Sequence, residues 1–213
     1  MKALLLVDIQ NDFLPGGSLA VEQGNEIIPL VNEMVRYPFD LIIATKDWHP
    51  ADHLSFASNH GKKAGQHIQL VGKDQILWPD HCVQQTKGSD FAPGWDHTNI
   101  DKVIYKGTNV AIDSYSTFFD NSHLKSTGLE DYLREKGIKD LYIAGLATDY
   151  CIKYSVLDAI QLGFNAHVIL DACRGVNLKP NDSNEAVQVM RKAGAVIIPF
   201  AELKGWLQKQ AVT

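Results

Sequence analysis

Six short apolar segments recur along the chain, each of the length of a β-strand. Their apolar residues follow one another almost without interruption instead of alternating with polar ones, which is typical of strands buried on both faces of a parallel sheet. The segments cover residues 3–7, 41–44, 103–105, 141–144, 167–170 and 196–198. The pattern therefore predicts a six-stranded, mostly parallel sheet.

Between several of these segments, apolar residues recur at the spacing of one helix face. Such stripes lie within residues 27–35, 129–133, 152–160 and 186–190. Alternation of strands and helices is typical of a doubly wound α/β fold, with helices on both faces of the sheet. With 213 residues, 45% of them hydrophobic, the chain is long enough for one full core, so we predict a single domain over residues 1–213.

Composition narrows the range of partners and compartments. The formal net charge of −5 gives no electrostatic reason to expect binding to nucleic acid or to an anionic membrane. Three widely spaced cysteines do not indicate a disulfide framework. The apolar run at the N-terminus stops at Asp8, too early for a signal peptide, and no run reaches membrane-spanning length. We therefore expect a cytoplasmic protein that acts on a small molecule; the sequence leaves its oligomeric state open, a homo-oligomer included.

Cys151 follows the apolar segment 141–144 after a short turn, at the predicted start of an amphipathic helix. Unpaired backbone N–H groups and the positive end of the helix dipole favour the thiolate there. Such a thiolate can attack a carbonyl carbon beside donors for the oxyanion. A buried, unreactive cysteine is the alternative interpretation of this residue taken alone.

Two charged residues also follow predicted strands. Asp8 comes directly after the first strand and Lys106 after the third, so both should lie with Cys151 at the carboxyl edge of the sheet. A carboxylate can take the thiol proton and return it to a leaving amine, and an ammonium can keep that carboxylate ionised. Taken singly, the Asp could be a helix cap and the Lys could reach solvent. Together with Cys151 they predict an amide hydrolase.

Residues 47–98 form a long polar segment, and a loop of this length within a compact domain is usually functional. Asp47, His49 and His53 lie close together after the second strand, and His81 follows downstream. One carboxylate and three imidazoles suit one divalent cation, Zn²⁺, Fe²⁺ or Mn²⁺, and leave positions for water or substrate. A polar surface loop with scattered histidines is the alternative.

Three aromatic residues lie near these positions. Phe13, Trp78 and Tyr115 could form the walls of a slot for a flat ring. For Tyr115, ordinary packing explains the residue equally well.

These motifs together resemble those of the nicotinamidase (pyrazinamidase) family of isochorismatase-like cysteine hydrolases. The similarity covers essentially the whole chain, and the family's catalytic and metal positions match the following residues: Asp8, Lys106 and Cys151; Asp47, His49, His53 and His81. The resemblance implies hydrolysis of nicotinamide to nicotinate and ammonia through a cysteine thioester, in the salvage of NAD, and of pyrazinamide to pyrazinoate.

The resemblance also implies details of the site. A metal, with Zn²⁺ as the first choice, would bind the ring nitrogen of the substrate. The backbone N–H groups of Ala147 and Cys151 would stabilise the oxyanion, and a cis peptide bond would lie directly before Thr148. Phe13 and Trp78 would enclose the ring.

Three other functions compete with this interpretation. A metal-independent isochorismatase-like or carbamoyl-amide hydrolase would share the Asp–Lys–Cys set but would not need Asp47 and the histidines. A non-catalytic metal-binding protein would not need Cys151. A dinucleotide-binding protein is not indicated, because no G-x-G-x-x-G turn follows the first strand.

Overall fold

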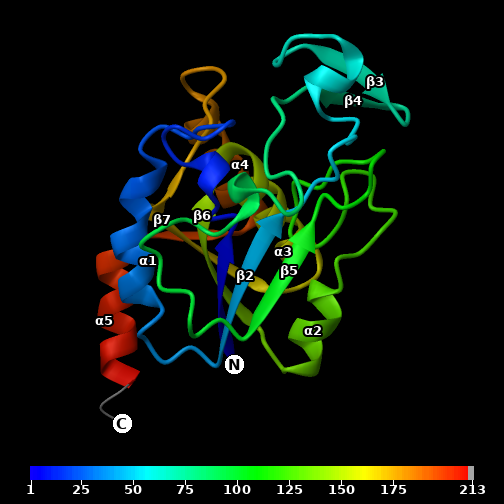
Figure 1. Cartoon of the computed structure of the whole chain (residues 1–213). Helices are drawn as coiled ribbons and strands as arrows, with labels where there is room; N and C mark the ends of the chain where they lie inside the picture. Colours follow the sequence, from blue (N-terminus) through cyan, green and yellow to red (C-terminus); the bar gives the residue numbers. More distant parts are fainter. Residues whose placement is uncertain (211–213) are drawn as a thin grey trace.

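A six-stranded sheet runs through the middle of the molecule (Figure 1). The computed structural model describes the backbone of residues 1–210 and the side chains of residues 1–205, so the end of the predicted domain lies outside the described residues. All neighbouring strands of this sheet are parallel, in the order β5-β2-β1-β6-β7-β8. The strands are β1 (Lys2–Val7), β2 (Leu41–Asp47), β5 (Lys102–Lys106), β6 (Asp140–Leu146), β7 (Asn165–Arg174) and β8 (Val196–Ile198). The predicted parallel sheet is confirmed.

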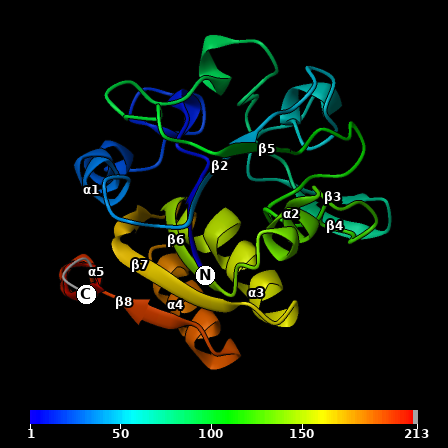
Figure 2. The same cartoon turned by 90° about the horizontal axis from the view of Figure 1, so that it is seen from below.

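Helices cover both faces of the sheet (Figure 2). Helices α1 (Ile28–Met34) and α5 (Phe200–Gln210) lie on one face, and α2 (Leu129–Glu135), α3 (Lys153–Gln161) and α4 (Asp182–Ala193) lie on the other. After Lys2, strand β1 is apolar because its residues alternate between two cores: Leu4 and Leu6 pack in the first, Leu5 and Val7 in the second. Among residues 1–210, no helix is long and apolar enough to cross a membrane.

The polar segment after β2 contains more regular structure than a loop. Strands β3 (His67–Leu70) and β4 (Lys73–Ile76) pair as an antiparallel hairpin outside the main sheet (Figure 1). Its two-residue turn consists of Val71 and Gly72, with φ angles of 50° and 74°. The prediction of a loop was wrong for this part of the segment, because both strands are short with polar residues in at least half of their positions, and a valine stands where asparagine or glycine usually marks such a turn.

The order of the strands reverses between β1 and β6. The chain proceeds outward from β1 through β2 to β5, and then from β6 through β7 to β8 on the other side. In sheets of this type, the carboxyl ends of the strands at the reversal leave a crevice between their diverging connections. The residues that follow β1 and β6, and the ends of β2 and β5, therefore meet at one edge.

Candidate active site and metal centre

Lys106 is the centre of a buried charged cluster. Its side chain is inaccessible to solvent, and its Nζ lies 2.8 Å from Asp8 Oδ2, 2.9 Å from Asp47 Oδ1 and 3.5 Å from Cys151 Sγ. Burial alone would lower the pKa of Lys106, but Asp47 and Asp8 outweigh it and hold this pKa well above its usual value. The lysine is therefore a fixed cation between two carboxylates and a thiol.

Cys151 lies in a single π-helical turn, Thr148–Ile152, ahead of α3 rather than at the start of an α-helix. Burial raises the pKa of its thiol well above the usual value, although Lys106 opposes this shift. Removal from water thus disfavours the charged form of this thiol more than the nearby cation favours it, which opposes the bias toward the thiolate expected from a helix start. The thiol needs a partner that takes its proton during attack.

Asp8 is that partner by position. It is fully buried and has a φ of 49°, in the left-handed region that residues other than glycine rarely adopt. Its backbone N–H donates to Thr45 Oγ1 (3.1 Å), and the Thr45 hydroxyl donates to Asp8 Oδ1 (2.5 Å). Burial raises the pKa of Asp8, and Lys106 opposes this shift. A carboxylate of raised pKa is suited to accept and return a proton near neutral pH.

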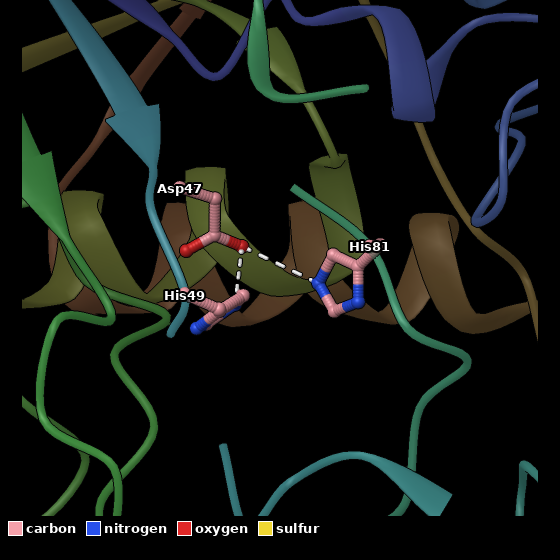
Figure 3. A group of neighbouring side chains, drawn as sticks. All are labelled: Asp47, His49 and His81. Atoms are coloured by element: carbon pink, nitrogen blue, oxygen red, sulfur yellow. Dashed lines mark ion pairs between the residues drawn. The ribbon is translucent and has the colours of Figure 1, made fainter. Parts of the chain in front are cut away.

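Asp47, His49 and His81 form a compact group beside this cluster (Figure 3). Asp47 Oδ2 lies 3.2 Å from His49 Nε2 and 3.5 Å from His81 Nε2. The Nδ1 atoms of the two rings lie 2.9 Å from the Gly107 carbonyl and 2.8 Å from the Pro79 carbonyl. Because a carbonyl only accepts, each Nδ1 carries a proton, and in the neutral ring each Nε2 offers a lone pair to a cation.

This group fits a divalent cation. Among the described residues, His49 Nε2 is buried without a hydrogen-bond partner of regular geometry, and it lies 3.2 Å from Asp47 Oδ2. Although burial opposes it, the pKa of Asp47 is held well below its usual value by a protonated His49 and by Lys106, so the carboxylate is ionised, and a bound cation would take the place of the His49 proton. One oxygen and two imidazole nitrogens are a ligand set that Zn²⁺, Fe²⁺ and Mn²⁺ accept.

His53 lies in a second group, together with His49 and Asp113. The backbone N–H of Ser55 points at His53 Nδ1 (3.1 Å), and Ser55 Oγ lies 2.7 Å from the same atom. Because an amide N–H only donates, Nδ1 accepts and the proton of the neutral ring sits on Nε2. Burial lowers the pKa of His53 to about 4, so the ring is neutral. The four predicted ligands therefore lie together, with the ring centres of His53 and His49 4.3 Å apart, and His53 differs from the other two histidines in the orientation of its ring.

Two residues outside the predicted set hold this centre in shape. Gln10 clamps the backbone of Asp47, since its Nε2 donates to the Asp47 carbonyl and its Oε1 accepts from the Asp47 N–H, both at 2.8 Å. Gly107 has a φ of 66°, and a Cβ added there would lie 2.4 Å from His49 Cε1. A larger residue at this position would displace the His49 ring.

A pocket opens above Cys151, and all of the residues expected to surround a substrate contribute to its walls. Phe13, Trp78, Tyr115 and Ala147 line it together with the thiol. The sequence did not indicate four further wall residues, Leu19, Asp113, Tyr150 and Val176. Trp78 and Tyr150 pack edge to face with ring centres 4.9 Å apart, and Trp78 Nε1 donates to the Tyr115 hydroxyl at 3.1 Å. The free space is about 20 Å³, room for about one water molecule.

Asp149 fixes one of these walls from within the nucleophile turn. It is buried, and its two carboxylate oxygens accept the N–H groups of Val176 (2.9 Å) and Asn177 (2.8 Å). The only sequence signal for this role is the position of the Asp two residues before the nucleophile. Its partners lie 27 and 28 residues further along the chain, so the sequence did not reveal the two hydrogen bonds. A cis peptide bond occurs between Leu146 and Ala147, one residue earlier than expected.

Comparison with known proteins agrees with this geometry. A family model described as the isochorismatase domain matches residues 2–202. A nicotinamidase of Escherichia coli (strain K12) is 47% identical over 204 residues, which covers 94% of this chain and 96% of the relative.

Solved structures give the same assignment. An Acinetobacter baumanii nicotinamidase/pyrazinamidase has a TM-score of 0.92 at 42% identity, over 95% of this chain and 97% of that one. A pyrazinamidase of Pyrococcus horikoshii in complex with zinc has a TM-score of 0.75 at 37% identity, over 93% and 98% of the two chains. With its Asp–Lys–Cys cluster beside a metal-binding group, the chain belongs to the isochorismatase family and, within that family, to the nicotinamidases.

Proposed function

We propose that this chain hydrolyses nicotinamide to nicotinate and ammonia with Cys151 as the nucleophile, in the salvage of NAD, and that it accepts pyrazinamide in the same pocket. The observation that carries the proposal is the cluster in which Lys106 Nζ contacts Asp8, Asp47 and Cys151 at once. The relatives named above carry out this class of reaction by name, which supports the choice of substrate.

In the first half of the reaction, Asp8 takes the proton of the Cys151 thiol while the sulfur attacks the carboxamide carbon. The developing oxyanion accepts hydrogen bonds from the backbone N–H groups of Ala147 and Cys151, both of which line the pocket. The C–N bond then breaks, and Asp8 passes its proton to the departing amide nitrogen. Ammonia leaves, and the acyl group remains on the sulfur as a thioester.

In the second half, water hydrolyses the thioester. Asp8 is ionised again and takes a proton from the water. The oxygen of that water attacks the carbonyl carbon of the thioester. The C–S bond breaks, nicotinate leaves, and the sulfur recovers its proton from Asp8. Lys106 stays charged throughout and stabilises each negative group that forms beside it, whether thiolate or carboxylate.

We further propose that Asp47, His49 and His81 hold a divalent cation, with Zn²⁺ as the first choice and Fe²⁺ or Mn²⁺ as alternatives. When bound, the cation supplies a Lewis acid that receives the ring nitrogen and orients the substrate. The lone pairs of the two Nε2 atoms and the ionised Asp47 support this assignment, and so does the zinc in the Pyrococcus horikoshii pyrazinamidase. They also argue against a metal-independent hydrolase. His53, whose Nε2 carries a proton, contributes a hydrogen-bond donor beside this centre.

Removal of the metal is expected to stop ammonia release from nicotinamide, because the ring loses the group that orients it toward Cys151. The purified protein is assayed for ammonia as isolated, after chelation, and after Zn²⁺, Fe²⁺ or Mn²⁺ is returned. We expect full activity in the protein as isolated and a loss of at least about 100-fold after chelation. Activity should recover when at least one of the three ions is returned. Activity that survives complete chelation would contradict the metal assignment, and absence of activity with every ion would contradict the proposed reaction.

The two kinds of histidine are expected to differ in their effect on metal content. His81→Ala removes a lone pair directed at Asp47 and should leave less than about one tenth of the metal bound, since loss of one inner ligand costs several kcal/mol. His53→Ala removes a hydrogen-bond donor and should keep most of the metal while weakening its affinity by roughly 10-fold. Elemental analysis after dialysis measures both. An equal loss of bound metal in the two variants would show that His53 is also a metal ligand.

We also propose that residues 1–213 form one domain that acts in the cytoplasm on a small molecule, rather than on nucleic acid or a membrane. The match of the family model to residues 2–202 and the net charge of −5 support this. All residues of the proposed mechanism come from one chain, so a homo-oligomer would carry one site in each subunit.

A further inference from the structure

The hydroxyl of Thr45 contacts Asp8 at two points. Thr45 follows the residues of β2 that pair with β1, where Leu6 lies opposite Ala44, and its side chain is completely buried. Its Oγ1 lies 3.1 Å from the Asp8 backbone nitrogen and 2.5 Å from Asp8 Oδ1. A single hydroxyl thus spans the backbone and the carboxylate of the residue that acts as the base.

The directions of these two hydrogen bonds follow from elementary chemistry. A backbone N–H only donates, so the hydroxyl oxygen accepts there. The hydroxyl has one proton, and the Asp8 carboxylate is the acceptor that it faces. Asp8 Oδ1 therefore accepts a hydrogen bond from Thr45, which occupies one of its lone pairs and makes it the less available oxygen for the thiol proton.

The other carboxylate oxygen is in a different situation. Asp8 Oδ2 lies 2.8 Å from Lys106 Nζ, is buried, and has no hydrogen-bond partner with regular geometry in the described part of the chain. Lys106 Nζ also contacts Cys151 Sγ at 3.5 Å, and the thiol lies within hydrogen-bond reach of the Asp8 carboxylate. Oδ2 is thus the oxygen with a free lone pair for the thiol proton.

We propose that Thr45 is the positioning residue of the general base: its hydroxyl occupies Asp8 Oδ1 and thereby assigns to Oδ2 the proton that moves between Cys151 and the leaving ammonia. This inference rests on the proposed function of Asp8 and Cys151. Without the hydroxyl, the carboxylate is free to rotate about its Cβ–Cγ bond and to offer both oxygens to the Lys106 ammonium. A carboxylate bound in that way is turned from the thiol and is a poorer base.

Three variants test the role of the hydroxyl. Thr45→Val keeps the shape of the side chain and removes both hydrogen bonds, whereas Thr45→Ser keeps them. Thr117→Val is the matched control, because Thr117 is also completely buried but its Oγ1 has no hydrogen-bond partner among the side chains that the structure describes. For each variant, kcat and KM for nicotinamide and the metal content are measured, together with the rate at which iodoacetamide alkylates Cys151 in the absence of substrate.

We expect kcat of Thr45→Val to fall roughly 10- to 100-fold, the range for loss of a hydrogen bond to a charged group, with KM and metal content nearly unchanged. Alkylation of Cys151 should slow as well, whereas Thr45→Ser and Thr117→Val should behave like the wild type in every measurement.

Three results would overturn the role of Thr45: a normal kcat in Thr45→Val, a change confined to KM, or a Thr45→Ser variant as slow as Thr45→Val. Alkylation needs no substrate, so it judges Thr45 even where the wild type fails to release ammonia from nicotinamide. Such a failure by itself would contradict only the proposed reaction.

Discussion

Replacement of Cys151 by alanine is expected to abolish nicotinamide hydrolysis while nicotinamide still binds. The variant loses the atom that forms the thioester, and removal of a nucleophile from a catalytic group of this kind typically costs on the order of 10⁴- to 10⁶-fold in kcat. The other walls of the pocket and the metal group do not depend on the thiol and should stay intact. Ammonia release measures the first effect, and calorimetric titration with nicotinamide measures the second.

Cys173→Ala provides the control for this experiment. Cys173 is another buried thiol, but it lies on β7 and donates to the Ile169 carbonyl rather than facing the pocket. Its loss should leave kcat within about twofold of the wild type, since a small buried substitution away from the site affects mainly stability. Turnover by Cys151→Ala near the wild-type rate would remove Cys151 from the mechanism altogether.

Lys106→Met is expected to impair both stability and catalysis. The substitution fills most of the volume but leaves Asp8 and Asp47 buried without their shared cation. Breaking a buried ion pair in this way costs about 3–5 kcal/mol, and for a chain of this size each kcal/mol lowers Tm by roughly 2–4 °C. We therefore expect the metal-free variant to melt on the order of 10 °C lower and its ammonia release, with metal restored, to fall at least about 100-fold.

Lys102→Met is the control for Lys106→Met, because it removes a lysine from the same strand without touching the buried cluster. Lys102 begins the same strand, β5, but its side chain is exposed. Surface substitutions of this kind usually change stability by less than about 0.5 kcal/mol, so its melting curve should overlay that of the wild type. A Lys106→Met variant with an unchanged Tm would mean that Asp8 and Asp47 do not depend on the ammonium.

The sheet and the cluster around Lys106 could be predicted because they follow from local patterns. Each strand of the main sheet contains an apolar run; Asp8, Asp47 and Lys106 end or directly follow such strands, and Cys151 follows one after a short turn. In a parallel sheet, position along the sequence then translates directly into position at one edge. Nothing more than strand boundaries was needed to bring these residues together.

The hairpin β3–β4 was not predicted, because no local sequence pattern indicates it. Its strands bury little, and its turn places Val71 at a positive φ that β-branched residues seldom adopt. Local preference argues against a turn at that point. The pairing of the two strands, rather than the preference of the turn residues, decides the conformation.

The residues that hold the site in shape could not be predicted from the sequence either. Thr45 is one polar residue within an apolar strand, and Asp149 looks like any acidic residue near a helix start. Their partners, Asp8 and the segment at Val176, lie 37 and 27 residues away in sequence. A hydrogen bond between distant segments leaves no periodic pattern, so only the folded structure reveals it.

The close packing of Trp78, Tyr115 and Tyr150 has a consequence for ligand affinity. With only about 20 Å³ free, a pyridine ring has to displace these side chains, so we expect a closed form in exchange with a less populated open form. The apparent affinity for any ring is then its affinity for the open form multiplied by the fraction that is open. Substitutions that loosen the edge-to-face contact of Trp78 and Tyr150 would therefore strengthen binding of bulky and small amides alike, without any new contact to the ligand.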